Sequence, residues 1–173
     1  MRTLIVAPHP DDELLGCGGT LLRRVNEGAV LGWLLMTSLT KDRGWTDDRI
    51  NERSFEIDQV RQALTIAPSY FYPLNFPTTE LDQFSTTNLV GKISSVFSNF
   101  QPDEVLLPHP GDVHSDHRVT FDAAIACTKW FRYPSVKRVM TYETPSETDF
   151  GLNPLHKSFV PNLFVDITDH IDK

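Results

Sequence analysis

Residues 4–13 read Leu-Ile-Val-Ala-Pro-His-Pro-Asp-Asp-Glu, and this stretch gives the strongest indication of the fold. Its first four residues form a short apolar run of the kind found in buried strands. From Glu13 to Glu27, leucines and Val25 then recur at helical spacing. The sequence therefore predicts a strand that leads directly into a helix, with one histidine and three carboxylates at the junction.

The same alternation of apolar runs and amphipathic segments continues along the chain. Further strands are predicted at residues 30–37, 70–74, 104–107, 136–142 and 163–167, and further helices at 47–64, 87–100 and 116–131. Parallel neighbouring strands need helical crossovers, so this order favours a mainly parallel sheet covered on both faces. We expect an α/β fold, a Rossmann-like three-layer sandwich, whose ligand site lies at the carboxyl ends of the strands.

Length and composition indicate one compact domain and exclude several kinds of partner. The 173 residues are 40% hydrophobic, enough for one continuous core. A formal charge of -7 would repel nucleic acid and anionic membrane surfaces. No apolar run approaches the roughly 18 residues of a membrane span. Cys17 and Cys127 have no paired-motif spacing, so we expect a cytoplasmic protein without a disulfide framework.

The glycine-rich residues 16–19 lie inside the first predicted helix. They read Gly-Cys-Gly-Gly and lack the Gly-x-Gly-x-x-Gly spacing of a dinucleotide loop. We interpret these glycines as packing residues that let the helix approach the sheet closely.

The first polar cluster follows the first predicted strand. His9 and Asp12 are three residues apart, which on a tight turn brings both side chains to one side, where they could hold one metal ion. Asp11 would then point away from that ion. The alternative is that the carboxylates only cap the helix and oppose its dipole, and we favour this interpretation for Glu13. Capping does not explain a histidine between two prolines, so the metal hypothesis is preferred for His9 and Asp12.

The second cluster, residues 108–117, follows the strand predicted at 104–107 and reads Pro-His-Pro-Gly-Asp-Val-His-Ser-Asp-His. His114 and His117 are three residues apart and could face one site. Adding one or both to the first cluster gives the two-imidazole, one-carboxylate ligand set of catalytic zinc, which leaves a position for water. Asp116 could hydrogen-bond an imidazole and fix its tautomer.

Four motifs in this order resemble the LmbE-like, or N-acetylglucosaminyl-phosphatidylinositol de-N-acetylase, family. They are His-Pro-Asp-Asp-Glu at 9–13, Arg-Ser-Phe-Glu at 53–56, His-Ser-Asp-His at 114–117, and Tyr-Glu-Thr-Pro-Ser-Glu-Thr at 142–148. The resemblance covers nearly the whole chain. It implies a zinc-dependent amidohydrolase that removes the acetyl group from an N-acetylglucosamine-type sugar or sugar conjugate.

The resemblance also implies roles for individual residues. The zinc ligands would be His9, Asp12 and His117. Asp11 would be the general base, and His114, oriented by Asp116, would stabilise the oxyanion in its protonated form. Arg43 and Glu143 would contact the sugar, although Arg43 could equally be a solvated loop residue and Glu143 a structural one.

Family members usually continue beyond the last predicted strand, whereas this sequence stops at Lys173. We therefore expect residues 1–173 to be a single LmbE-like domain that lacks the family's C-terminal segment. Two alternatives to the deacetylase remain open: a metal-dependent phosphoesterase, and a non-catalytic sugar-binding module. The sugar's identity, metals other than zinc and assembly into a homo-oligomer also stay open.

Overall fold

The computed structural model describes residues 1–152, 155 and 158–171, and its centre is a sheet of five strands in the order β3-β2-β1-β4-β5. Every pair of neighbouring strands is parallel. The strands are β1 (Arg2–Ala7), β2 (Val30–Ser38), β3 (Phe71–Pro77), β4 (Glu104–Pro108) and β5 (Arg138–Tyr142). The predicted α/β fold with a parallel sheet is confirmed.

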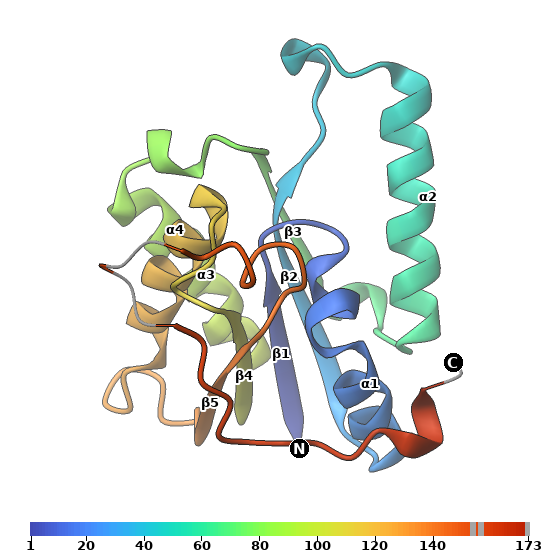
Figure 1. Cartoon of the computed structure of the whole chain (residues 1–173), viewed down its shortest axis with the longest axis vertical. Helices are drawn as coiled ribbons and strands as arrows, with labels where there is room; N and C mark the ends of the chain where they lie inside the picture. The colour runs from blue at the N-terminus through green and yellow to red at the C-terminus, as the bar shows by residue number, and fades with distance from the viewer. Residues whose placement is uncertain (153–154, 156–157, 172–173) are drawn as a thin grey trace.

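Helices cover both faces of this sheet, which gives three layers (Figure 1). The helices are α1 (Asp12–Asn26), α2 (Asp47–Ala63), α3 (Thr86–Phe100) and α4 (Ser115–Ile125). Strand side chains alternate between the two faces. Leu4 and Val6 of β1 therefore join the core that includes residues of α3 and α4, while Ile5 and Ala7 join the core that includes residues of α1 and α2.

The strand order reverses beside β1, and this reversal positions the site. The chain passes from β1 through α1 to β2 on one side, and later returns to place β4 on the other side of β1. Ligand sites of open parallel sheets lie at the carboxyl ends of the strands at such a switch point. Both polar clusters of the sequence follow these two strands, because His9 comes after β1 and residues 109–117 come after β4.

Two of the predicted elements differ from the observed ones. Residues 163–167 form no strand; the segment is largely exposed, with Phe164 82% accessible, and is not part of the five-stranded sheet. An apolar run without a pairing neighbour cannot satisfy its backbone as a strand does. The helix predicted to reach residue 131 ends at Ile125 and continues as a 3-10 turn over Ala126–Thr128.

Two of the three glycines of α1, Gly16 and Gly19, serve packing, whereas a Cβ atom on Gly18 would make only ordinary contacts with Leu14. A Cβ atom on Gly16 would lie 2.3 Å from the ring carbon Cδ2 of Tyr142, so only glycine allows this approach between α1 and β5. The helix is also kinked at Cys17, whose φ is -150° and ψ 21°. Cys17 and Cys127 are both free and buried. None of the described helices is long and apolar enough to cross a membrane.

Candidate metal centre

Hydrogen bonds to the neighbouring strand β2 fix the start of the turn between β1 and α1. The carbonyl oxygen of Pro8 accepts hydrogen bonds from the backbone nitrogen (3.1 Å) and the hydroxyl (2.8 Å) of Thr37 in the neighbouring strand β2. The backbone nitrogens of Asp11 and Asp12 then turn back onto the carbonyl of His9. This tight turn brings His9 and Asp12 to the same side, as their spacing predicted.

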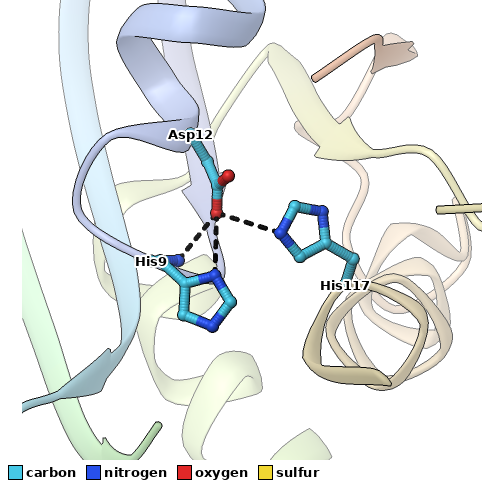
Figure 2. Close-up of side chains that lie close together, drawn as sticks. All are labelled: His9, Asp12 and His117. Carbon is cyan, nitrogen blue, oxygen red and sulfur yellow. Dashed lines mark hydrogen bonds and ion pairs between the residues drawn. The ribbon is translucent and has the colours of Figure 1, made fainter. Parts of the chain in front are cut away.

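Two imidazoles, one from each cluster, converge on one carboxylate oxygen of Asp12 (Figure 2). Asp12 Oδ2 accepts from the backbone nitrogen of His9 at 2.8 Å and lies 3.4 Å from His9 Nδ1. His117 Nε2, from α4, approaches the same oxygen at 3.3 Å. Asp12 and His117 are buried, and the His9 side chain is 17% exposed. The structure thus brings together the three predicted metal ligands.

Asp116 contacts a different histidine from the one that the family resemblance implied. Its Oδ2 lies 3.0 Å from Nε2 of His9, and its carboxylate also accepts from the backbone nitrogens of Thr79 (2.7 Å) and Leu81 (3.1 Å). Towards His114, Asp116 offers only its backbone nitrogen, which donates to Nδ1 at 3.1 Å. The carboxylate of Asp116 thus bonds to the imidazole of His9 and not to that of His114, which the resemblance implied.

The charges of the cluster favour a cation at its centre. Burial by itself lowers the pKa of His9, but hydrogen bonds with Asp116 and Asp12 outweigh burial and raise that pKa to about 9. Burial likewise lowers the pKa of His117, and Asp112 and Asp12 together raise it to about 9. Burial raises the pKa of Asp12, yet the two imidazoles hold that pKa well below its usual range. The carboxylates around the two imidazole rings thus stabilise positive charge between them.

The donor set fits a divalent transition metal. His117 Nε2 is buried and faces Asp12 Oδ2 at 3.3 Å without a hydrogen bond to any described residue, so after losing its proton it would offer a lone pair to an ion. One atom each from His9, Asp12 and His117 lie within 4.8 Å of one another. Two imidazole nitrogens and one carboxylate oxygen are a known ligand set of catalytic zinc. A second group of His9, His114 and Asp116 meets the same distance criterion but shares His9 with the first.

Asp11 lies beside the ligands and faces a small cavity of about 120 Å³. The cavity is also lined by His9, Thr37 and Arg53. Partial burial and the neighbouring charge of Asp12 raise the pKa of Asp11. Arg53 of α2 donates to the carbonyl oxygen of Pro10 at 3.0 Å. This hydrogen bond holds the positively charged guanidinium of Arg53 next to the carboxylate of Asp11. A carboxylate and a guanidinium thus border a cavity that also reaches His9, one of the three candidate ligands.

The two residues predicted to contact sugar do not line this cavity. The guanidinium of Arg43 pairs with Glu80 at 2.6 Å, and its side chain is 48% exposed. Glu143 is exposed and follows β5, beside a groove along α1. Their role in sugar binding stays a prediction. Glu13, interpreted as a helix cap, is buried; one of its oxygens accepts from the backbone nitrogen of Asp11 at 3.2 Å.

Sequence reasoning gave no role to Asp112, which the structure places against the ring of His117. Asp112 Oδ2 lies 2.8 Å from His117 Nδ1, and both side chains are fully buried. The density of aspartates in residues 108–117 was a visible signal. It could not tell which aspartate pairs with which histidine, because that depends on the path of the loop before α4.

The fold is an all-parallel α/β sandwich, and two histidines and one aspartate meet at its switch point. Together these features indicate an α/β protein with a candidate hydrolytic metal centre. The sequence profile of the GlcNAc-PI de-N-acetylase (PIG-L) family matches residues 4–128. The chain belongs to this family, as its motifs predicted.

Individual relatives agree with this assignment. Diacetylchitobiose deacetylase of Thermococcus kodakarensis is 28% identical over 178 residues, covering 97% of this chain and 64% of that protein. The crystal structure of the conserved protein TT1542 from Thermus thermophilus has a TM-score of 0.75 and 27% identity, covering 98% of this chain and 73% of that one.

A third relative is N,N'-diacetylchitobiose deacetylase from Pyrococcus horikoshii, solved with its inhibitor MPG. Its structure has a TM-score of 0.75 and 26% identity, covering 99% of this chain and 66% of that one. The chain therefore spans just under two thirds of the length of the two diacetylchitobiose deacetylases that it resembles.

Proposed function

We propose that this protein is a zinc-dependent hydrolase that removes the acetyl group from an N-acetylglucosamine-type sugar or sugar conjugate. The observation that carries the proposal is the convergence of His9, Asp12 and His117 on one point beside Asp11. Membership of a de-N-acetylase family and the likeness to diacetylchitobiose deacetylases support the choice of reaction and substrate. In this proposal His9 Nδ1, Asp12 Oδ2 and His117 Nε2 bind the ion.

Zinc bound there would polarise the acetyl carbonyl and lower the pKa of water towards about 7. Asp11 accepts a proton from the attacking water molecule while the oxygen of that water bonds to the carbonyl carbon. The same carboxyl then returns the proton to the sugar nitrogen as the carbon–nitrogen bond breaks, releasing the free amine and acetic acid, which ionises to acetate. The raised pKa of Asp11 makes its carboxylate a stronger base for the first transfer, because a catalytic base works best when its pKa lies near the working pH.

His114 stabilises the oxyanion as a neutral imidazole in this proposal. Its Nδ1 accepts a hydrogen bond from the backbone nitrogen of Asp116, and a ring nitrogen that accepts cannot carry a proton. The remaining hydrogen therefore sits on Nε2, which is free to donate to the developing negative charge. Burial and the charge of His9 also lower the pKa of His114. This replaces the protonated His114 expected from the sequence.

In this proposal three residues contact the sugar. Arg53 joins the two predicted residues, Arg43 and Glu143, because its guanidinium lines the cavity beside Asp11. Arg43 would have to leave its ion pair with Glu80 to reach a sugar. Arginine and carboxylate side chains suit hydroxyl groups, since they offer charged donors and acceptors.

The test combines metal stoichiometry with acetate release. The purified protein is loaded with zinc, and acetate is measured with N,N'-diacetylchitobiose, N-acetylglucosamine and further N-acetylated conjugates as substrates. Asp11→Asn should keep one zinc ion per chain but lower kcat by roughly 100- to 10,000-fold, the usual contribution of a general base. Asp122→Asn, which changes an exposed carboxylate on α4, serves as the matched control with unchanged kcat.

Other outcomes separate the alternatives. Full activity in Asp11→Asn would remove this residue from the mechanism. Sugar binding with bound zinc but without acetate release would indicate a binding module. Two metal ions per chain together with phosphatase activity would indicate a phosphoesterase.

A further inference from the structure

A line of hydrogen bonds leads from the ring of His117 to a turn after β5. Asp112 Oδ2 lies 2.8 Å from Nδ1 of His117, and Asp112 Oδ1 accepts from the hydroxyl of Thr148 at 2.7 Å. The same hydroxyl oxygen accepts from the backbone nitrogen of Thr144 at 2.8 Å. The loop and the turn are joined again by the backbone nitrogen of Val113, which donates to the carbonyl of Glu147. A segment far from the ligands in sequence is thus bonded to one of them.

The direction of each bond is fixed by chemistry. The hydroxyl oxygen of Thr148 accepts from an N–H group, so its own hydrogen is available to Asp112. The carboxylate of Asp112 can only accept, so Nδ1 of His117 must carry a hydrogen. The lone pair of a neutral His117 then lies on Nε2, the buried atom that has no hydrogen-bond partner among the described residues.

We propose that Asp112 and Thr148 are positioning residues for the metal ligand His117: Asp112 fixes its tautomer and ring orientation, and Thr148 holds Asp112 in place. This inference rests on the metal site of the proposed function. Carboxylates that hold ligating histidines in this way typically contribute 10- to 100-fold to metal affinity or activity. Asp112 lies on the Nδ1 side of the ring, away from the site, and therefore acts only through His117.

Burial makes the pair sensitive to small changes. Neither Asp112 nor His117 has any accessible side-chain surface, so water cannot replace a lost partner without rearrangement. The turn that supplies Thr148 is closed by backbone bonds from Glu147 and Thr148 to the carbonyl of Thr144, at 3.1 and 2.9 Å. This turn belongs to the motif of residues 142–148, which would therefore act by holding Asp112 against the candidate ligand His117.

The test measures metal binding in four variants: Asp112→Asn, Thr148→Val, Thr148→Ser and the control Thr141→Val, which alters an exposed threonine of β5. Dissociation constants for Zn²⁺ are obtained by competition with a chelator. Asp112→Asn should weaken binding by about 10- to 100-fold. Thr148→Val should weaken it by about fivefold, the equivalent of the hydrogen bond that Thr148 donates to Asp112, whereas Thr148→Ser and Thr141→Val should bind as the wild type does.

A second readout separates positioning from a purely structural role. With Co²⁺ in place of Zn²⁺, the visible absorption of the metal reports the geometry of its ligands. We expect this spectrum to change in Asp112→Asn and Thr148→Val and to be restored in Thr148→Ser. Lower thermal stability with an unchanged spectrum and unchanged affinity would overturn the inference. Thr148→Val, the milder change, decides the matter if Asp112→Asn does not fold.

The outcomes for the wild type keep the two proposals distinguishable. If it binds zinc with the expected variant pattern but releases no acetate, the deacetylase proposal fails and the positioning roles stand. If it is active while both variants bind zinc normally, only the positioning roles fail. If it binds neither Zn²⁺ nor Co²⁺, both are overturned.

Discussion

Two buried charged clusters lie at opposite ends of the central strands, and they differ in how completely their polar atoms are paired. At the amino end, the carboxylate of Glu104 in β4 is 1% exposed and accepts from Arg24, Thr3 and Arg138. Arg24 alone contributes two bonds, at 2.9 and 3.2 Å. Both carboxylate oxygens are satisfied by the protein itself.

At the carboxyl end, the cluster of candidate metal ligands contains a buried polar atom that makes no hydrogen bond. His117 Nε2 makes no hydrogen bond within the described part of the chain, although Asp12 Oδ2 lies 3.3 Å away, and a cavity opens beside His9 and Asp11. An unpaired buried polar atom costs about 1 to 3 kcal/mol, so it persists where a ligand or a function accounts for it. The network around Glu104 is closed and contributes to the stability of the fold, whereas the network around His117 keeps a ring nitrogen that a ligand could bind.

The largest predicted effect comes from removing a ligand. His117→Ala should weaken zinc binding by at least about 1,000-fold, because loss of a ligand's outer partner alone costs 10- to 100-fold. Acetate release should disappear with the metal. Isothermal titration with zinc and an acetate assay measure both effects.

The matched control for this change is His109→Ala, in the same loop. His109 is also nearly buried but lies outside both ligand groups found among the described residues. It should keep its zinc. If His117→Ala bound zinc as tightly as His109→Ala did, the contrast between the two ends of the sheet would lose its functional meaning.

The second prediction breaks the closed end instead. Glu104→Ala leaves Arg24 buried without its partner, and removing one member of a buried pair typically costs 3 to 5 kcal/mol. We expect about 3 kcal/mol, at the lower end, because Arg138 is partly solvated and Arg24 keeps a bond to Glu27. Urea denaturation measures the loss, and zinc affinity should stay unchanged.

Glu104→Gln tests whether charge or hydrogen bonding dominates at this end. Glutamine keeps one acceptor oxygen, so the variant should lie between the wild type and Glu104→Ala in its free energy of unfolding. A weaker zinc affinity in either variant would show that the two clusters are coupled through the sheet.

Most of the fold could be predicted because local pattern and tertiary packing agree. The alternation of Leu4 and Val6 with Ile5 and Ala7 places β1 between two cores, and the crossovers then require parallel strands. Residues 163–167 were predicted wrongly because an apolar run identifies a strand only where a neighbour is available for pairing. Sequence spacing carries no information about such a neighbour.

The candidate site was likewise predictable only where local sequence spacing determines which residues meet. Spacing of three residues on a turn or a helix start placed His9 with Asp12, and the family resemblance added His117 as the third ligand. The outer contacts were not predictable: the carboxylate of Asp116 bonds to His9 rather than His114, and Asp112 bonds to His117. These partners depend on loop paths that bring residues from separate elements together, and no periodicity encodes those paths.

The smallest predicted effect sharpens the comparison within the closed end. Arg138 donates to Glu104 at 3.1 Å, but its side chain is 57% exposed, whereas that of Arg24 is 10% exposed. A solvated ion pair contributes about 0 to 1 kcal/mol, so Arg138→Ala should lower the free energy of unfolding by no more than that. Urea denaturation of Arg138→Ala and Arg24→Ala under identical conditions gives the comparison, and Arg24→Ala should be clearly less stable because it leaves a buried carboxylate without its bidentate partner. Equal losses in the two variants would mean that Arg138 is as necessary as Arg24 for closing the network, and that the solvent-exposed edge of the sheet contributes to its stability.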